Sequence, residues 1–245
     1  CLEQAINLAN LPFAHDHIAL MPDTHTGKGM PIGGVIACKN TVIPNAVGVD
    51  IGCGMAFVQT DIPVNILRDT VTGSELIKVI VGNILRTIPV GFSHYGKPQT
   101  SAVLDKAQSE IERYNADSEL LKFIEQGYYS VGSLGGGNHF IELDQDENGC
   151  FYVIIHSGSR CLGKNIFDHY MKKGQKYLKK QGLHVPYELT WLEGGLKEQY
   201  LNDLELTQQF AALNREAILD ELLRGMKWKA DTVISCQHNY VDQTQ

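Results

Sequence analysis

The stretch Asn45-Ala-Val-Gly-Val-Asp-Ile-Gly-Cys-Gly-Met55 organises the chain, because it sets a carboxylate and a thiol three residues apart among glycines. Glycine adopts backbone conformations closed to other residues and lets a backbone approach a ligand closely. The apolar residues before Asp50 predict a strand that ends in a tight turn and presents Asp50 and Cys53 to one point. A carboxylate and a thiolate together suit a metal ion. The alternative is a turn around an inert buried cysteine, and this stretch alone does not separate the two.

The length and composition limit the classes of protein to which the chain can belong. The chain has 245 residues, enough for one large domain or two small ones, with 43% hydrophobic and 20% charged residues. A net charge of −7 argues against general nucleic-acid binding but permits a local basic cleft. Six cysteines at irregular spacing, without a C-x-x-C pair, favour a reducing cytoplasm, and no apolar run is long enough to span a membrane. Because the chain begins with Cys1, we expect its natural N-terminus to lie upstream.

Hydrophobic periodicity predicts an α+β fold. Several expected strands follow one another directly, which favours mixed β-sheets with flanking helices over a doubly wound fold. Two apolar runs separated by Lys39-Asn40 predict a hairpin within residues 32–43. Helices are expected over residues 1–11, 75–86, 102–126 (in one or two pieces), 162–181 and 199–224, strands over 17–21, 55–62, 140–143, 151–155 and 232–236, and loops over 90–101 and 182–198.

Five residues able to bind a metal lie at the ends of strand-like segments: Asp50, Cys53, His139, His156 and His238. A single histidine is usually a core or surface residue, but five such groups at equivalent positions are harder to explain that way. They exceed the four ligands of a closed structural zinc site, which favours two metals that share the thiolate. The softness of the donors by itself suggests zinc.

Three other polar features have two interpretations each. The segment from Pro22 to Gly29 holds Asp23 and His25, which suits proton transfer but also an ordinary polar turn. Lysines within residues 172–180 predict a solvated helix face more strongly than a phosphate-binding patch. Asn214-Arg215 interrupts the otherwise apolar middle of the last long helix.

Five motifs in this order resemble the successive signatures of the RtcB-type RNA-splicing ligases. The resemblance spans residues 22 to 239, and the motifs around Asp50 and before Arg160 are the most specific. The motifs are Pro22-Asp-Thr-His-Thr-Gly-Lys-Gly29, Val47-Gly-Val-Asp-Ile-Gly-Cys-Gly-Met55, Gly135-Gly-Gly-Asn-His-Phe140, His156-Ser-Gly-Ser-Arg160 and His238-Asn239.

The resemblance implies an activity and its cofactors. That family joins an RNA 3′-phosphate or 2′,3′-cyclic phosphate to a 5′-hydroxyl with GTP and two Mn²⁺ ions, in tRNA splicing or RNA repair. It implies one metal on Asp50, Cys53 and His139, and a second on Cys53, His156 and His238. It therefore replaces zinc with manganese in our expectation. The implied partners are RNA and GTP, without a membrane.

The resemblance also implies further site residues. A nucleotide site would be lined by Asn138, His139, Phe140, Ile141, Glu142, His238 and Asn239. Arg160 would bind a phosphate, for which a planar guanidinium is suited. Asp23 is the candidate for proton transfer at the reacting hydroxyl.

One departure from the family pattern concerns the nucleophile. The family's guanylated histidine lies in a C-terminal motif, and none of the nine histidines here has that context. The resemblance implies a single RtcB-like catalytic domain over residues 1–245, folded around a central metal-binding cleft and incomplete at its C-terminus and at its N-terminus. We therefore expect that this chain does not ligate RNA by itself. The alternatives are a non-catalytic module that binds RNA ends or nucleotides, and a two-metal phosphoesterase.

Overall fold

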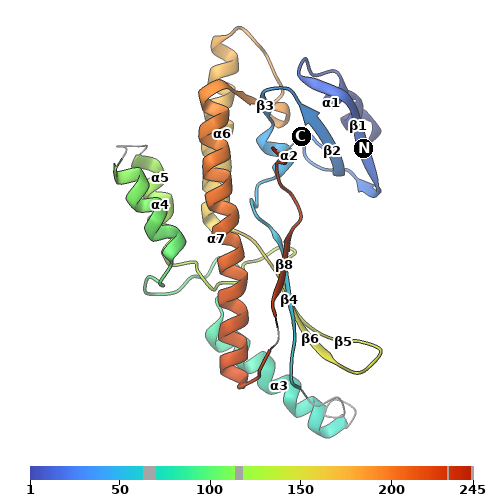
Figure 1. Ribbon diagram of the computed structural model, residues 1–245, viewed down its shortest axis with the longest axis vertical. Helices are drawn as coiled ribbons and strands as arrows, with labels where there is room; N and C mark the ends of the chain where they lie inside the picture. Colours follow the sequence, from blue (N-terminus) through green and yellow to red (C-terminus); the bar gives the residue numbers. More distant parts are fainter. Residues whose placement is uncertain (63–69, 114–117, 231, 244–245) are drawn as a thin grey trace. The chain divides into compact units, whose positions relative to one another are not determined.

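A computed structural model describes residues 1–62, 70–113, 118–230 and 232–243 (Figure 1). The fold is α+β, as the sequence predicts. The chain divides into two compact units, one formed by Cys1–Val49, Lys164–Glu205 and Val241–Gln245, the other by Asp50–Gly163 and Leu206–Tyr240. Two compact units can belong to one catalytic domain, so the single catalytic domain expected from the sequence stays a prediction.

The first unit holds helix α1 (Leu2–Ala9) and a long antiparallel pair, β1 (Ala14–His25) with β2 (Ile32–Cys38). A second small pair joins β3 (Thr41–Val42) to β7 (Leu192–Glu193). Helix α2 (Pro44–Val47), the turn η1 (Tyr187–Leu189), most of helix α6 (Arg160–Lys180) and the start of helix α7 (Gly194–Met226) complete it. Its buried apolar cluster consists of Leu8, Phe13, Met30, Ile43, Leu178 and Trp191.

Three local predictions for this unit are wrong. The expected hairpin within residues 32–43 does not form, because β2 pairs with β1 and β3 pairs with β7. Strand pairing depends on distant partners, which a local pattern does not reveal. The expected loop over 182–198 contains η1, β7 and the start of α7. The apolar approach to Asp50 is helix α2, because Pro44 in its first turn favours helical dihedrals and Gly48, at φ 99°, ends it.

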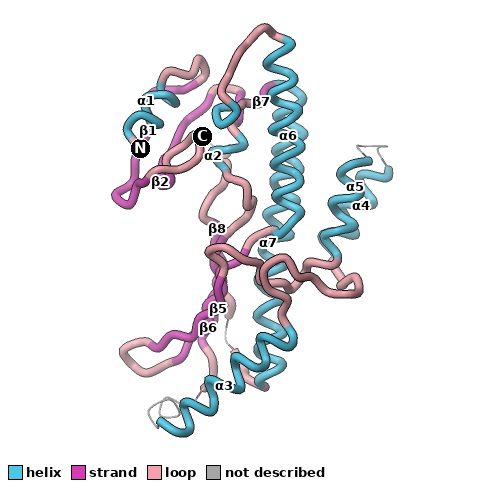
Figure 2. The backbone as a smooth tube through the Cα atoms, turned by 180° about the vertical axis from the view of Figure 1, so that it is seen from behind, coloured by secondary structure: helices cyan, strands magenta, loops and turns pink. Residues whose placement is uncertain are grey.

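The second unit is built on a four-stranded antiparallel sheet in the order β5-β6-β4-β8, whose strands are labelled in Figure 1. Figure 2 shows the same sheet from behind. Its helices are α3, α4 and α5, together with the later part of α7. The predicted helix over 102–126 is present as α4 and α5, and its residues 114–117 lie outside the described residues. The bounds are β4 Gly54–Gln59, β5 Phe140–Gln145, β6 Phe151–Ser157, β8 Ile234–Gln237, α3 Thr70–Thr87, α4 Ala102–Arg113 and α5 Ser118–Tyr128.

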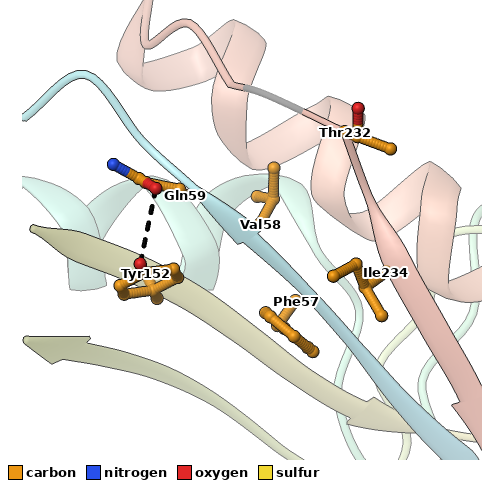
Figure 3. A pocket seen from close by; sticks show the side chains of 6 residues that line it. All are labelled: Phe57, Val58, Gln59, Tyr152, Thr232 and Ile234. Atoms are coloured by element: carbon orange, nitrogen blue, oxygen red, sulfur yellow. Dashed lines mark hydrogen bonds between the residues drawn. The ribbon is translucent and has the colours of Figure 1, made fainter. Parts of the chain in front are cut away.

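Helix α7 covers one face of this sheet. Ala56 and Ile155, on neighbouring strands, share a buried cluster with Ile218 and Leu222 of the helix. On the opposite face, the side chains of Phe57, Tyr152 and Ile234 line an open pocket (Figure 3). The sheet therefore has one packed and one open side.

The antiparallel register determines where the strand ends meet. Gly54, at the start of β4, lies opposite Ser157 at the end of β6 and Gln237 at the end of β8. Phe140, at the start of β5, lies opposite His156. One edge of the sheet thus receives the four segments that carry the predicted metal ligands. In the part of the chain that the structure describes, no helix combines the length and apolar character needed to cross a membrane.

Candidate metal centre

The side chains of the five predicted ligand residues meet at this edge of the sheet. They form two groups that share one thiol: Asp50, Cys53 and His139 make one group, and Cys53, His156 and His238 make the other. Within each group, the atoms able to bind a metal all lie within 4.8 Å of one another. Residues more than 180 positions apart in the sequence therefore contribute donors to one small volume.

Cys53 lies between the two groups. Its Sγ atom is 3.2 Å from Nε2 of His156 and 3.8 Å from Nε2 of His139. In the first group, Nε2 of His139 is 2.8 Å from Oδ2 of Asp50. In the second group, Nε2 of His238 is 3.1 Å from Nε2 of His156. Each imidazole therefore directs the same nitrogen, Nε2, toward the centre.

The turn between α2 and β4 has little free space around Asp50 and Cys53. The backbone N–H of Cys53 donates to the carbonyl oxygen of Asp50 at 3.0 Å, which closes the turn. Gly52 has a φ of 75°, a conformation that other residues rarely adopt. A Cβ atom added to Gly158 would collide with the carboxylate of Asp50. The glycines of both motifs thus allow the carboxylate and the thiol to reach the same point.

Backbone carbonyls fix the tautomers of two histidines. Nδ1 of His139 lies 2.9 Å from the carbonyl oxygen of Leu134, and Nδ1 of His156 lies 2.9 Å from that of Asn138. Since a carbonyl can only accept, both Nδ1 atoms carry the proton, and in the neutral rings both Nε2 atoms keep a lone pair. Metal-binding histidines are usually oriented in this way, with the second ring nitrogen donating to a carbonyl or carboxylate.

The electrostatics of the centre favour a cation. Burial, and after it the charge of Asp50, raises the pKa of the Cys53 thiol to about 12. Burial, and after it the neighbouring His156 and Arg215, lowers the pKa of His238. A divalent metal would stabilise the thiolate of Cys53, which burial and Asp50 disfavour. It would also bind the neutral imidazole of His238, the form that the lowered pKa favours. The mixed carboxylate, thiolate and imidazole donors therefore fit divalent metals.

Several predicted nucleotide-binding residues lie next to this centre. Asn138 and Asn239 are exposed, as are Phe140 and Glu142 on β5. Ile141 instead packs against the buried cluster under α7, because successive side chains of a strand alternate between faces. Any contact of Ile141 with a nucleotide would therefore use its backbone.

Arg160 is half-buried at the start of α6. Its Nε atom donates to Oγ of Ser133 at 3.0 Å, and its Nη2 atom donates to the carbonyl oxygen of Gly91 at 2.8 Å. Gly135 lies against the guanidinium, where a Cβ atom would collide with it. These contacts hold the guanidinium rigidly beside the His139 segment, and its role toward phosphate stays a prediction.

Asp23 belongs to the first unit. It is exposed on β1, and its backbone carbonyl oxygen lies 3.0 Å from Nδ1 of His25. Its role in proton transfer stays a prediction.

Asn214, whose role was not predicted from the sequence, lies on α7 near the centre and is fully buried. Its Nδ2 atom lies 3.1 Å from the carbonyl oxygens of Ser133 and Gly158, and its Oδ1 atom accepts from the N–H of Gly132 at 2.8 Å. The segment before His139 and the segment after His156 are therefore joined through one side chain. The sequence signal was a polar pair, Asn214-Arg215, in the middle of a buried helix.

Comparison with known proteins agrees with the motifs. A family model described as tRNA-splicing ligase RtcB matches residues 4–245. The RNA-splicing ligase RtcB of Escherichia coli K12 is 33% identical over 273 residues, which cover 99% of this chain and 64% of that protein. The tRNA-splicing ligase RtcB of Thermococcus kodakarensis is 31% identical over 262 residues, which cover 89% of this chain and 53% of that protein.

The extent of these matches has two consequences. The chain spans between half and two thirds of the length of these relatives. Family membership therefore does not by itself assign the activity of the whole relatives to this chain. The family model, in contrast, extends over nearly all of the present sequence, including every segment that carries a donor of the metal centre. The chain therefore belongs to the family of the tRNA-splicing ligase RtcB.

Proposed function

We propose that this chain supplies the two-metal centre of an RNA ligase that joins a 3′-phosphate or 2′,3′-cyclic phosphate end to a 5′-hydroxyl end with GTP and two Mn²⁺ ions. The observation that carries the proposal is the pair of donor groups that share Cys53. The names of the relatives from E. coli and T. kodakarensis support RNA ligation and tRNA splicing as the activity. RNA repair is a second use of the same reaction.

Each donor group would hold one metal. Asp50, Cys53 and His139 would bind the first, and His156 and His238 would bind the second together with the shared thiolate. Metals bound there would neutralise phosphate charge as Lewis acids, which lowers the barrier to displacement at phosphorus. Leu134 and Asn138 contribute by accepting the Nδ1 protons of His139 and His156, which keeps both Nε2 lone pairs directed at the centre.

The RNA and the nucleotide would approach from the exposed residues around the centre. Phe140 and Glu142 on β5 and Asn239 after β8 are accessible, so they are candidates for contacts with GTP. Arg160 would bind a phosphate oxygen, and Asp23 would accept or supply the proton of the reacting hydroxyl. Because the net charge of the chain is −7, attraction of RNA would depend on the metals and on local basic side chains.

The first test is the metal content of the purified chain. Titration of the metal-free protein with Mn²⁺ should give two bound ions per chain. The second test compares fluorescently labelled RNAs that end in a 3′-phosphate or a 3′-hydroxyl. We expect Mn²⁺-dependent binding that prefers the 3′-phosphate and is lost in Cys53→Ala. Equal binding of both RNAs, with or without Mn²⁺, would contradict the proposal.

A third test separates a ligase from the alternative activities. RNA with a 2′,3′-cyclic phosphate and a second RNA with a 5′-hydroxyl are incubated with Mn²⁺ and GTP, in a protein that spans the full length of the relatives and carries this chain. A joined product that requires GTP supports the ligase. Opening of the cyclic phosphate, or release of phosphate, without GTP would indicate a phosphoesterase. Binding of RNA without turnover would indicate a non-catalytic module.

A further inference from the structure

Arg215 is a buried charged residue on α7, close to the metal centre. Its exposed fraction is 1%, which is unusual for arginine. Removing a guanidinium from water is costly unless its N–H groups find acceptors. The acceptors that it contacts therefore indicate what this side chain does.

The guanidinium bonds to three segments of the chain. Nη1 donates to the carbonyl oxygen of Gly52 at 2.7 Å and to that of Ser157 at 3.1 Å. Nε and Nη2 both lie 3.3 Å from Oγ of Ser235. One side chain thus joins the turn before β4, the end of β6 and strand β8.

Each of these acceptors lies within three residues of a potential metal donor in the sequence. Gly52 directly precedes Cys53, Ser157 directly follows His156, and Ser235 lies three residues before His238. The backbone N–H of His238 in turn donates to the carbonyl oxygen of Cys53 at 3.0 Å. The three segments that Arg215 joins are therefore the three that carry the Cys53–His156–His238 group.

The chemistry of arginine suits this geometry. A guanidinium presents several N–H donors in a fixed plane, so it can hold several acceptors at set positions. A lysine ammonium is a compact charge on a flexible stem and cannot reproduce that spacing.

We propose that Arg215 is a positioning residue of the metal centre, which fixes the Cys53, His156 and His238 segments relative to one another and so sets the spacing of their donor atoms. The proposal rests on the metal-binding part of the proposed function. The role requires the planar guanidinium of arginine and not only a positive charge, so lysine should not replace Arg215.

The contacts predict an unequal effect on the two metals. In the Cys53–His156–His238 group, all three segments bond to Arg215. In the Asp50–Cys53–His139 group, only the turn that carries Asp50 and Cys53 does, through Gly52. The His139 segment is held instead by Asn214, through Ser133 and Gly132. Loss of Arg215 should therefore weaken the metal bound by His156 and His238 far more than the other metal.

The test uses Co²⁺, whose thiolate and ligand-field absorption bands report the geometry of the bound ion without any activity assay. Metal-free wild-type, Arg215→Lys and Arg215→Met proteins are titrated, after circular dichroism has established that each variant is folded. Arg224→Met is the matched control, because Arg224 is an exposed arginine of the same helix. Replacing residues that orient metal ligands typically lowers metal affinity about 10- to 100-fold.

We expect both Arg215 variants to bind one Co²⁺ about 10- to 100-fold more weakly than wild type, with altered absorption bands, while the other ion changes little. Arg224→Met should match wild type. The site is identified in a His238→Ala background, which removes a ligand of the affected metal. There, Arg215→Lys should have little further effect on the remaining ion, because contacts that act through one site are not additive.

Ser235→Ala provides a gentler variant if the Arg215 variants do not fold, since it removes only the hydroxyl acceptor. It should weaken the same ion, by a smaller factor. Unchanged Co²⁺ affinity and spectra in these variants would overturn the role of Arg215, and equal weakening of both ions would show a general structural role instead. A wild-type protein that binds no Co²⁺ would contradict the metal centre itself, which is a different result.

Discussion

Nε2 of His139 lies 2.8 Å from Oδ2 of Asp50, while Nδ1 of the same ring donates its proton to the carbonyl oxygen of Leu134. In a neutral ring, a lone pair therefore faces a carboxylate oxygen, and two acceptors at this distance repel unless a cation lies with them. A metal ion bound by both atoms would meet this need. His139 and Asp50 are therefore candidates for two ligands of one metal ion.

Asp50→Asn tests this relationship. The amide can donate an N–H to Nε2 of His139, so the metal-free variant should be as stable as wild type. An amide is a weaker metal ligand than a carboxylate, so the metal content should fall from two ions to one per chain. Metal analysis and thermal unfolding measure both effects. Asp144→Asn, an exposed aspartate on β5, is the control, and two tightly bound ions in Asp50→Asn would rule out Asp50 as a ligand.

Cys53→Ala should have a larger effect, because Cys53 is the only residue common to both donor groups. We expect the loss of both ions, with an affinity decrease of at least about 100-fold for each, as removal of a direct ligand exceeds the effect of its supporting contacts. Metal titration measures the loss. Cys150→Ala, in the turn between β5 and β6, should retain two ions. So should His17→Ala, because His17 lies on β1 and belongs to neither donor group. Survival of two ions in Cys53→Ala would mean that the thiolate is not shared.

Metal binding should also release protons. Burial and Asp50 raise the pKa of Cys53 from 9.0 to about 12, so the thiol is protonated at neutral pH and must lose its proton to bind a metal. Apparent affinity should therefore rise with pH, by up to about tenfold per unit for this one proton. The lowered pKa of His238 leaves that ring neutral at pH 7, so it competes with protons only under more acidic conditions.

Calorimetric titration at pH 7.5, in two buffers of different ionisation enthalpy, counts the protons released. One proton per chain is expected from Cys53, and heats that do not depend on the buffer would contradict this. The stability of the metal-free protein should change with pH in the opposite direction to its metal affinity. Because the folded state favours the protonated thiol, its stability should be complete at neutral pH and decrease as pH rises from about 9.0 toward about 12.

The sequence predicted the α+β class and the residues that meet at the centre for a definite reason. Asp50, His139 and His238 lie at the ends of segments that pair in antiparallel order, and antiparallel ends meet at the same edge of a sheet. The local pattern placed these residues at strand ends, whereas the strand pairing that brings the ends together is seen only in the structure. The same local pattern was wrong for the hairpin at Lys39-Asn40, because β3 pairs instead with a strand about 150 residues away.

The contacts of Arg215, in contrast, could not be predicted from the sequence. Its position in a buried helix stripe was visible in the sequence as a polar interruption, but its acceptors were not. Gly52, Ser157 and Ser235 become its neighbours only when three strands and the helix assemble. Side chains that bond to backbone carbonyls leave no residue-type signature at the other end of the bond. Such supporting contacts therefore require a structure, whereas residue types able to bind a metal can be recognised in the sequence.

Gly158 provides the last prediction, because its role depends on space and not on backbone conformation. A Cβ atom at this position would collide with both carboxylate oxygens of Asp50, whereas its backbone is not in the left-handed region. Gly158→Ala should therefore fold and displace the Asp50 carboxylate, since a side chain moves more easily than the strand end. Metal titration should show an affinity loss of about tenfold or more for the ion bound by Asp50 and His139, with the other ion nearly unchanged. Gly96→Ala, where a Cβ meets no atom within 4 Å, should bind both ions normally. If Gly158→Ala retains both affinities, the collision is relieved without moving the carboxylate out of the centre. The motif His156-Ser-Gly-Ser-Arg160 would then need its glycine for a reason other than space for Asp50.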